Sequence, residues 1–406
     1  MKKTRININT NSNIYIKTLW SFVFGKTDNY FKIFSKKLKE YLCSDNLLVT
    51  AQGRVAGFNI FKVLINPNKN EIIISPYTLT EVINAIIYAG AKPIYVEIDI
   101  KTGLPLHSDL DYKINKNTAA VVLTHLYSNK EDILKFKDRY FGKVTIVEDV
   151  AINFGAKIEK NKYLGTIFDY GFYSFGVMKN LFTFHGGAIY AKDKKKLDEI
   201  EDNLKKNVNY PTLSSIKLAL FCLLIDIAYN KYIYNFFTHH ILNLSLPSLD
   251  KIMYPGVYPK FSDKIPSHYK YKFRKNFLIA GIENLNGLSS RINNRVENVK
   301  LYEKYLNKNL LINSFQNYEI NSFLEYPILL KKNKSTFVSS ILLSNGYDIR
   351  HTWYVNSTRF LKLTYNLKNF PNCEILHNHI LSLPTHSNIK ENDIVKICKL
   401  INEFEK

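Results

Sequence analysis

The chain has 406 residues, of which 46% are hydrophobic and 22% are charged. That length accommodates two domains around a substantial core, and that composition excludes a largely disordered protein. The net charge of +21 favours acidic partners such as phosphates or an anionic membrane surface, although a Lys-, Asn- and Ile-rich composition explains it equally simply. Because no arginine-rich arm or nucleic-acid-binding motif is present, we do not expect nucleic acid as a partner.

The cysteines are isolated in the sequence. Cys43, Cys222, Cys373 and Cys398 form no Cys-x-x-Cys pair, and no histidine spacing suits zinc. Neither a disulfide framework nor a metal site is therefore expected. The N-terminus is basic but lacks the apolar stretch of a signal peptide. These features predict a protein of the reducing cytoplasm.

From about residue 48 to 195, short apolar runs alternate with helical stretches, which is typical of a parallel sheet with crossover helices. A helical segment over 53–64 follows the first strand, at 47–50. Uninterrupted β-branched runs indicate strands that are buried on both faces. In such a sheet the ligand lies beyond the carboxyl ends of the strands. Further strands are predicted over 71–75, 93–98, 119–124, 144–147 and 187–190.

Residues 205–265 do not follow this alternation of strands and helices. Residues 218–225 are apolar on all sides of a helix, and 232–246 add aromatic side chains with few charges. The longest uninterrupted apolar run has eight residues, well short of the ~20 that span a bilayer, so no transmembrane helix is expected. Two interpretations stay open: an interfacial membrane helix whose lysines meet anionic lipids, or a helix that packs on the core or covers a dimer interface. The second interpretation is the simpler one.

Helical periodicity returns after this segment and continues to about residue 310. A strand over 323–330, a helix over 334–345 and a terminal helix over 391–405 then predict a small C-terminal α+β domain. We therefore expect a large domain over 1–286, which includes the apolar and aromatic insert at about 205–265, and a small domain over 287–406.

Four polar residues stand out at and after the end of the predicted strand at 144–147. Glu148 and Asp149 close this apolar run, and Ser174 and Lys179 follow within thirty residues. A carboxylate, a hydroxyl and an amine are the contacts that pyridoxal phosphate needs for its pyridine nitrogen, its phosphate and its Schiff base. Taken alone, this spacing is only suggestive.

Several sequence blocks together resemble the DegT/DnrJ/EryC1/StrS family, the fold-type-I pyridoxal-phosphate aminotransferases that act on nucleotide-linked keto sugars. Each block is weak alone, but their order and spacing are specific, and they cover most of the chain except about 205–265. The resemblance implies an α/β fold of the fold-type-I transferases, with a mostly parallel sheet in the large domain, and a homodimer that builds its active site from both subunits. The blocks are 77–79, 84–93 (NAIIYAGAKP), 96–99, 124–127, 148–156, 164–171, 174–188 and 381–386.

The resemblance assigns the two catalytic residues. Lys179 matches the family's Schiff-base lysine, whose amine moves a proton between the substrate Cα and the cofactor C4′. Asp149 matches the carboxylate that keeps the pyridine nitrogen protonated. The simpler alternatives are a solvated surface lysine and a helix N-cap.

Phosphate contacts are implied at two further places. Ser174 matches a hydroxyl donor to the cofactor phosphate, and the backbone amides of Gly53, Arg54 and Val55 match a helix N-terminus that binds the same group. The family usually has Ser or Thr where this chain has Arg54, which either holds the phosphate or faces solvent. Lys272 replaces an asparagine that reaches the partner subunit's cofactor phosphate, and it either does the same or lies in a solvated basic loop.

Three further residues depart from the family pattern. Leu79 replaces an aromatic residue that packs on the cofactor ring, and Ile152 replaces a Gln or His near that ring. Both can still enclose the ring by apolar contact. His185 replaces a glutamate and is either a buried structural histidine or an acid or base of the active site.

The implied function is an aminotransferase that moves an amino group, with glutamate as the expected donor, to the keto group of a nucleotide-linked sugar for surface polysaccharide synthesis. One alternative is a pyridoxamine-phosphate-dependent sugar dehydratase, in which a histidine replaces the lysine, and Lys179 argues against it. The other alternative is a non-catalytic cofactor-binding protein in regulation or assembly, suggested by Arg54, Ile152 and His185. The expected location is the cytoplasm, with possible peripheral contact at the inner face of the membrane.

Overall fold

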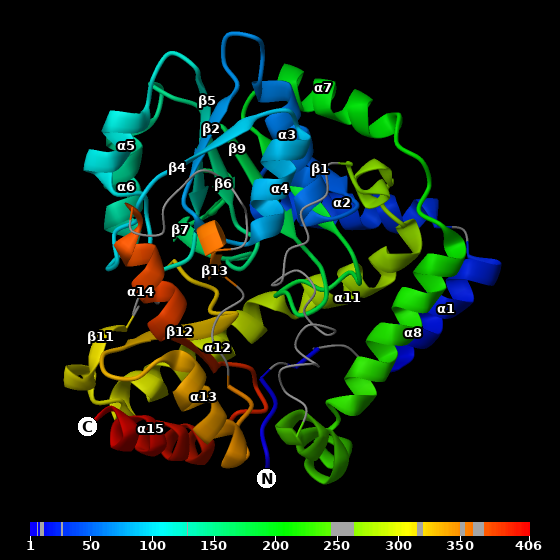
Figure 1. Ribbon diagram of the computed structural model, residues 1–406. Helices are drawn as coiled ribbons and strands as arrows, with labels where there is room; N and C mark the ends of the chain where they lie inside the picture. The colour runs from blue at the N-terminus through cyan, green and yellow to red at the C-terminus, as the bar shows by residue number, and fades with distance from the viewer. Residues whose placement is uncertain are drawn as a thin grey trace.

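The computed structural model describes residues 1–5, 7–8, 12–25, 27–127, 129–244, 264–314, 320–349, 354–359 and 369–406. The last part of the predicted insert, 245–263, lies outside the described residues. A seven-stranded sheet forms the core of the N-terminal part, and a three-stranded sheet that of the C-terminal part (Figure 1).

The large sheet has the order β1-β10-β9-β6-β5-β2-β4. Neighbouring strands from β4 to β9 pair in parallel, whereas β10 runs antiparallel to both β9 and β1. The predicted, mostly parallel sheet is therefore confirmed. Its strands are β1 (Leu47–Thr50), β2 (Glu71–Ile74), β4 (Lys92–Tyr95), β5 (Thr118–Thr124), β6 (Ile146–Asp149), β9 (Tyr170–Ser174) and β10 (Gly187–Ala191).

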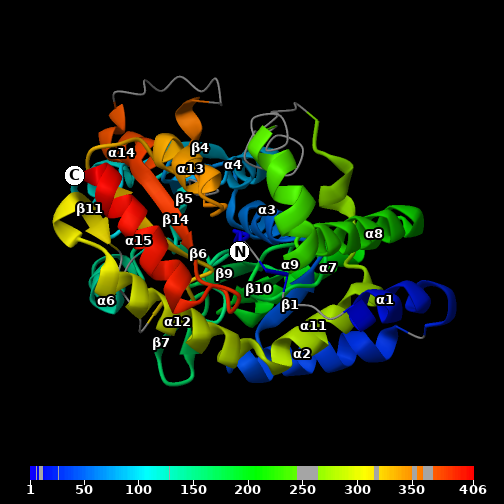
Figure 2. The ribbon, with the colours of Figure 1, turned by 90° about the horizontal axis from the view of Figure 1, so that it is seen from below.

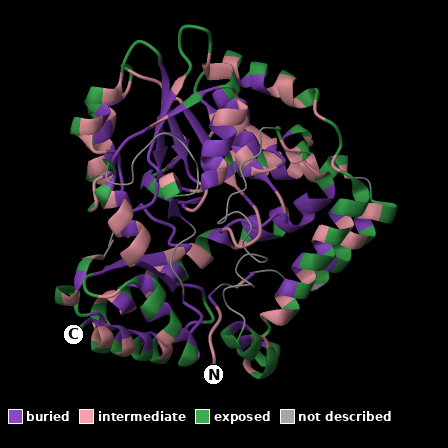
Figure 3. Ribbon diagram, viewed as in Figure 1, coloured by how far each residue is buried: buried purple, intermediate pink, exposed green. Residues whose placement is uncertain are grey.

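Helices cover both faces of this sheet (Figures 1 and 3). Successive strand side chains point to opposite faces, so Ile72 and Ile74 enter one apolar cluster and Ile73 enters the other. This double burial explains the unbroken β-branched runs in the sequence. The first cluster contains α3 (Gly53–Leu64), α4 (Thr80–Tyr88) and α7 (Lys194–Lys205); the second contains α2 (Asp28–Leu42), α5 (His107–Lys113), α6 (Lys130–Tyr140) and α11 (Leu278–Asn286).

The C-terminal sheet is antiparallel, with the order β11-β12-β14, and three helices bury its apolar side chains. The predicted terminal helix over 391–405 is confirmed. Two links tie this part to the N-terminal part: β13 (Val355–Asn356) pairs with β3 (Tyr77–Thr78), and Lys3 bridges to Tyr347. The domain division after residue 286 stays a prediction. The elements are α12 (Leu288–Tyr305), β11 (Leu311–Ser314), β12 (Glu325–Leu330), α13 (Ser335–Ser344), α14 (Pro371–His379), β14 (Ile380–Pro384) and α15 (Glu391–Glu405).

The insert begins with helix α8 (Thr212–Ala228), which runs alongside α1 (Ser12–Phe24) at one edge of the molecule (Figures 1 and 2). A short helix α9 (Lys231–Ile233) and a π-helical turn η1 (Tyr234–Thr238) follow. In the described part of the chain no single helix is long and apolar enough to cross a membrane; Thr212–Ala228 and Lys231–Leu244 meet that criterion only together, and they are bent by 60°. The remaining short elements are β7 (Lys157–Glu159), β8 (Lys162–Tyr163), η2 (Ser267–Lys270), η3 (Lys275–Phe277), η4 (Lys308–Leu310) and η5 (Ser357–Arg359).

Strand β6 extends two residues beyond the predicted end at Val147 and includes the acidic pair. Glu148 is fully buried there because its carboxylate accepts hydrogen bonds from the backbone N–H groups of Gly165 (2.8 Å), Ile167 (2.9 Å) and Phe168 (3.0 Å). The ring of His125 also lies 2.9 Å from it. Four partners replace the water that a carboxylate normally needs, so a charged residue fits inside the sheet.

Replacing Glu148 by alanine should lower the free energy of unfolding by about 3 kcal/mol or more, because several buried N–H groups would lose their acceptor. The measurement is the denaturant midpoint of unfolding. Glu159→Ala, at an exposed position of β7, is the matched control and should change the midpoint little. Equal midpoints for the two variants would contradict a structural role for Glu148.

Candidate active site

Asp149 is the last residue of β6 and points to the opposite side of the sheet from Glu148. It is buried, and its Oδ1 accepts a hydrogen bond from the N–H of Ala151 (3.0 Å). Burial raises the pKa of Asp149 to about 6, while this N–H group, Lys179 and His125 oppose the shift. Glu148 is thus committed to the fold, and Asp149 is the carboxylate of the pair that a ligand can use.

Lys179 lies in the loop between β9 and β10, within electrostatic reach of Asp149. Burial lowers the pKa of Lys179, and Arg54 lowers it further, whereas Asp149 and Glu325 act in the opposite direction. A lowered pKa favours the neutral amine, which is the nucleophilic form.

The backbone around Lys179 is held on both sides. Met178 adopts a φ of +72°, a conformation that costs a non-glycine residue free energy and persists only where the surroundings enforce it. On the other side, the Asn180 side-chain amide donates to Ser322 Oγ (2.6 Å) and to the carbonyl of Phe154 (3.3 Å). The backbone position of Lys179 is therefore held by its two neighbours in the chain.

Ser174, the last residue of β9, lies against the N-terminus of α3. A Cβ placed on Gly53 would come within 2.8 Å of the Ser174 Cβ, so only glycine permits this approach. The first N–H of α3 bonded within the helix is that of Ala56, to the carbonyl of Gln52 (3.0 Å), and Gln52 provides no side-chain cap. The N–H groups of the preceding residues and the Ser174 hydroxyl therefore converge on one place, which suits an anion.

Arg54 and Val55 follow Gly53 in the first turn of α3. Val55 is fully buried, so its side chain is not available to a ligand. Arg54 Nη1 pairs with Glu81 Oε1 of α4 (3.1 Å), with about a third of its side chain exposed. The guanidinium thus has a partner within the chain, and its charge is felt by Lys179 and by His185.

His185 is half-buried near the same helix end. Burial lowers its pKa to about 4, with smaller contributions from Arg54 and His268. Its imidazole is therefore neutral at neutral pH, and its ring centre lies 6.2 Å from that of Tyr210. The two predicted alternatives for His185 stay open, since a neutral ring suits both.

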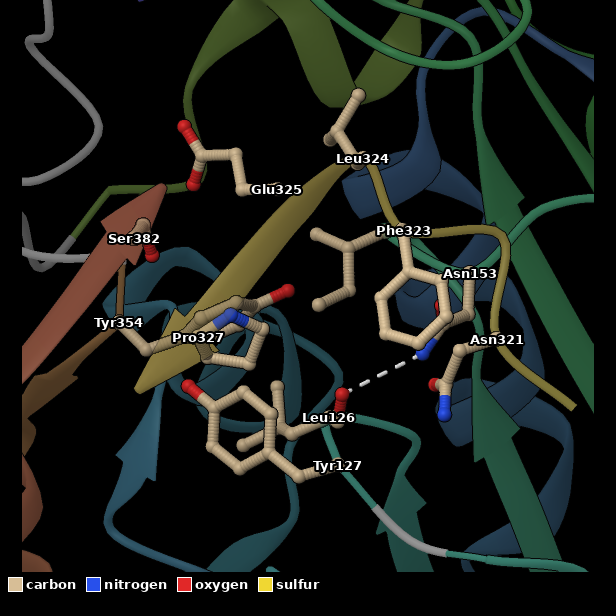
Figure 4. A pocket seen from close by; sticks show the side chains of 11 residues that line it. Leu126, Tyr127, Asn153, Asn321, Phe323, Leu324, Glu325, Pro327, Tyr354 and Ser382 are labelled. Atoms are coloured by element: carbon tan, nitrogen blue, oxygen red, sulfur yellow. Dashed lines mark hydrogen bonds between the residues drawn. The ribbon is translucent and has the colours of Figure 1, made fainter. Parts of the chain in front are cut away.

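Leu79 and Ile152 are half-buried and pack against the core cluster that contains α3 and α4. Ile152 also lines a cavity between the two sheets, shown in Figure 4. Loops of the large sheet contribute one side of this cavity and residues of the C-terminal part the other. The lining residues are Leu126, Tyr127, Ile152, Asn153, Asn321, Phe323, Leu324, Glu325, Pro327, Tyr354 and Ser382.

Lys272 lies apart from these residues. It is exposed, and its backbone N–H donates to the carbonyl of Val208 (2.7 Å). Within the described residues its side chain forms no hydrogen bond or ion pair with Lys179, Asp149 or Ser174. The structure thus groups the other predicted site residues and leaves Lys272 on the surface.

Two neighbours of the site were not predicted. Glu325 lines the cavity and influences Lys179, and it is held by Arg5 through Nε (2.7 Å) and Nη2 (3.3 Å). Burial raises the pKa of Tyr354, and the nearby Asp149 carboxylate raises it further. Both come from the C-terminal part, about 150 residues or more beyond the motifs, and no local pattern in the sequence marks them.

A lysine and a carboxylate beyond the carboxyl ends of a mostly parallel sheet, beside a helix N-terminus that suits an anion, define an α/β enzyme with the fold of the pyridoxal-phosphate-dependent transferases. The chain belongs to the DegT/DnrJ/EryC1/StrS aminotransferase family, whose sequence model matches residues 13–208 and 256–402. The predicted family and fold are therefore confirmed, and the unmatched residues 209–255 fall within the predicted insert.

Comparisons with individual proteins agree. An uncharacterised protein of Methanocaldococcus jannaschii is 24% identical over 403 residues, 96% of this chain and 92% of that protein. GDP-perosamine synthase of Escherichia coli O157:H7 is 32% identical over 171 residues, 42% of this chain and 47% of that enzyme, so the match spans about half of this relative. The structure of Helicobacter pylori PseC, an aminotransferase involved in pseudaminic acid biosynthesis, has the same fold, with a TM-score of 0.72, 17% identity and 99% coverage of both chains.

Proposed function

We propose that this protein is a pyridoxal-phosphate-dependent aminotransferase that transfers an amino group, with glutamate as donor, to the keto group of a nucleotide-linked sugar. The observation that carries the proposal is the half-buried Lys179 within electrostatic reach of the buried Asp149 carboxylate. The family assignment and the activity of a relative, GDP-perosamine synthase, support the sugar substrate. The proposal includes a role in surface polysaccharide synthesis, which is supported by a relative from Salmonella typhimurium named lipopolysaccharide biosynthesis protein RfbH, 24% identical over 190 residues.

The residues present fit the cofactor. The Ser174 hydroxyl and the free amides of the first turn of α3 suit its phosphate, because hydrogen-bond donors and the positive end of a helix favour an anion. Asp149, whose pKa lies well above that of a solvated aspartate, would become fully ionised beside a pyridinium cation. Leu79 and Ile152 are placed on an apolar cluster beside this region.

When bound, the cofactor withdraws electrons from the bonds at the substrate Cα. Asp149 holds the proton on the pyridine nitrogen, which maintains that withdrawal. The Lys179 amine, kept in its neutral and nucleophilic form by its lowered pKa, would link to the cofactor and would be the group that moves a proton between the substrate Cα and the cofactor C4′. The φ of Met178 and the Asn180 hydrogen bond to Ser322 hold the backbone on either side of Lys179.

We also propose a homodimer in which Lys272 reaches the cofactor phosphate of the partner subunit. Its exposure and its lack of polar contacts with the site of its own chain support this role. A cytoplasmic location is part of the same proposal, because nucleotide-linked sugars and glutamate are cytoplasmic metabolites in this reaction class.

The function is tested by transfer of isotopically labelled nitrogen. The purified protein is incubated with pyridoxal phosphate, amino-labelled glutamate and a panel of nucleotide-linked keto sugars, and the products are read by mass spectrometry. The proposal predicts labelled amino sugar from at least one member of the panel. Loss of a sugar hydroxyl without label transfer would instead support the dehydratase.

Replacing Gly53 by alanine should weaken pyridoxal phosphate binding about tenfold, because the new methyl group would push the α3 N-terminus away from Ser174. The measurement is the Kd from the cofactor's absorbance. Gly57→Ala in the same helix is the control, since its Cβ would meet the side chains of Phe61 at 3.3 Å and Phe172 at 3.7 Å and no backbone atom among its nearest neighbours. An unchanged Kd for Gly53→Ala would remove this helix end from the cofactor site.

A further inference from the structure

Helices α1 and α8, which lie side by side, and the turn η1 that follows them in the chain present an apolar surface to solvent. We name it the apolar ridge and define it by Trp20 and Phe24 of α1, Leu213 and Leu224 of α8, and Phe236 and Phe237 of η1. Each of these side chains is between 61% and 72% exposed. Their combined apolar area is on the order of 600 Å², at or above the largest patch that a typical monomeric protein leaves in water.

The ridge belongs to helices whose other face is already buried. On α8, Ala219, Cys222 and Ile225 pack into a cluster with Phe184, and the Tyr15 hydroxyl of α1 donates to the carbonyl of Cys222 (3.4 Å). The exposed apolar positions 213, 220, 224 and 227 are spaced by seven, four and three residues, so they share one face of α8, and Phe221 is exposed next to that face. Because the inner face of α8 is packed on the protein, only its outer face can contact an apolar partner, and the helix cannot be surrounded by it.

The charges around the ridge are mainly positive. Across 12–24 and 212–244 there are three lysines, Lys17, Lys217 and Lys231, and one carboxylate, Asp226. All three lysines are exposed, and Lys17 Nζ lies 3.9 Å from Glu283 of α11. Asp226 is partly buried, and burial raises its pKa to about 6. The surface that accompanies the apolar side chains is therefore cationic.

These charges favour a lipid surface over a second copy of the chain as the partner of the apolar ridge. A second copy of the chain in a twofold contact would bring the same lysines face to face, which is unfavourable. An anionic lipid surface would attract them while its acyl region accepts the apolar side chains. The family model also leaves 209–255 unmatched, so the sequence of α8 departs from the family pattern.

We propose that the apolar ridge docks this protein on an anionic lipid membrane, with α1 and α8 lying along the interface. Both helices run side by side at the edge of the molecule in two perpendicular views, so they can reach a flat surface together (Figures 1 and 2). The predicted membrane contact of the insert is thereby extended to α1. Since the ridge contains no residue of the Lys179–Asp149 site, membrane binding and catalysis are separable.

The test is sedimentation of the full chain with vesicles of phosphatidylcholine alone and of equimolar phosphatidylcholine and phosphatidylglycerol. We expect at least about tenfold tighter binding to the anionic vesicles, and a loss of this preference in high salt. The triple variant W20S/F236S/F237S should bind anionic vesicles at least about tenfold more weakly. The variant K17Q/K217Q/K231Q, which keeps every ridge residue, should lose the preference for anionic lipid.

The matched control is Y112S/F337S, which removes two aromatic side chains, 87% and 50% exposed, from α5 and α13. It should bind as the unchanged protein does, and all variants should bind pyridoxal phosphate equally. Failure of the unchanged protein to sediment with anionic vesicles would overturn the proposal, as would unchanged binding by W20S/F236S/F237S. A lower oligomeric mass of that variant in lipid-free solution would show that the ridge is a protein interface and would also overturn it.

Discussion

Lys179→Ala should abolish transamination, with a rate loss of at least about a thousandfold, and borohydride should no longer fix the cofactor to the protein. No other amine is placed beside Asp149 by the described residues in a position to replace it. The fold should survive, because the substitution removes a half-buried amine whose charging is already disfavoured. The measurements are the initial rate with labelled glutamate, the absorbance after reduction and the thermal midpoint.

Lys160→Ala is the control for this variant, since Lys160 is exposed in the β7–β8 hairpin. It should keep the rate and the reducible cofactor. Retention of either property by Lys179→Ala would show that the catalytic amine lies elsewhere.

Asp149→Asn should slow the reaction roughly a hundredfold, equivalent to about 3 kcal/mol of barrier, because a neutral amide cannot keep the pyridine nitrogen protonated. The amide oxygen can still accept from the Ala151 N–H, so the turn after β6 should be preserved. The measurement is kcat at saturating cofactor, with Asp138→Asn on the exposed side of α6 as the control. An unchanged kcat would remove Asp149 from the mechanism.

The fold was largely predictable where each strand is buried on both faces. Runs such as 119–124 contain little but β-branched and small residues, because helices cover both sides of β5. Strand β9 was not predicted, since Gly171 and Ser174 interrupt its apolar pattern. Helices α1 and α2 were not predicted either; the exposed apolar face of α1 blurs the periodicity that an amphipathic helix would show.

The candidate site was predictable where its chemistry is local in the sequence. Asp149, Ser174 and Lys179 stand at strand ends or in the adjoining loop, where a parallel sheet places its ligands. The same logic could not find Glu325 or Tyr354, because their approach to the site depends on how the C-terminal part packs. Nor could it find that Arg54 pairs with Glu81, a contact between the first turns of two helices.

The most direct test of the Lys179–Asp149 site is to reduce the protein with borohydride in the presence of pyridoxal phosphate, digest it and locate the pyridoxyl group by mass spectrometry. We predict a single modified peptide, with the group on Lys179. A pyridoxyl group on a different lysine, or no modified peptide at saturating cofactor, would contradict the proposed site and the function built on it.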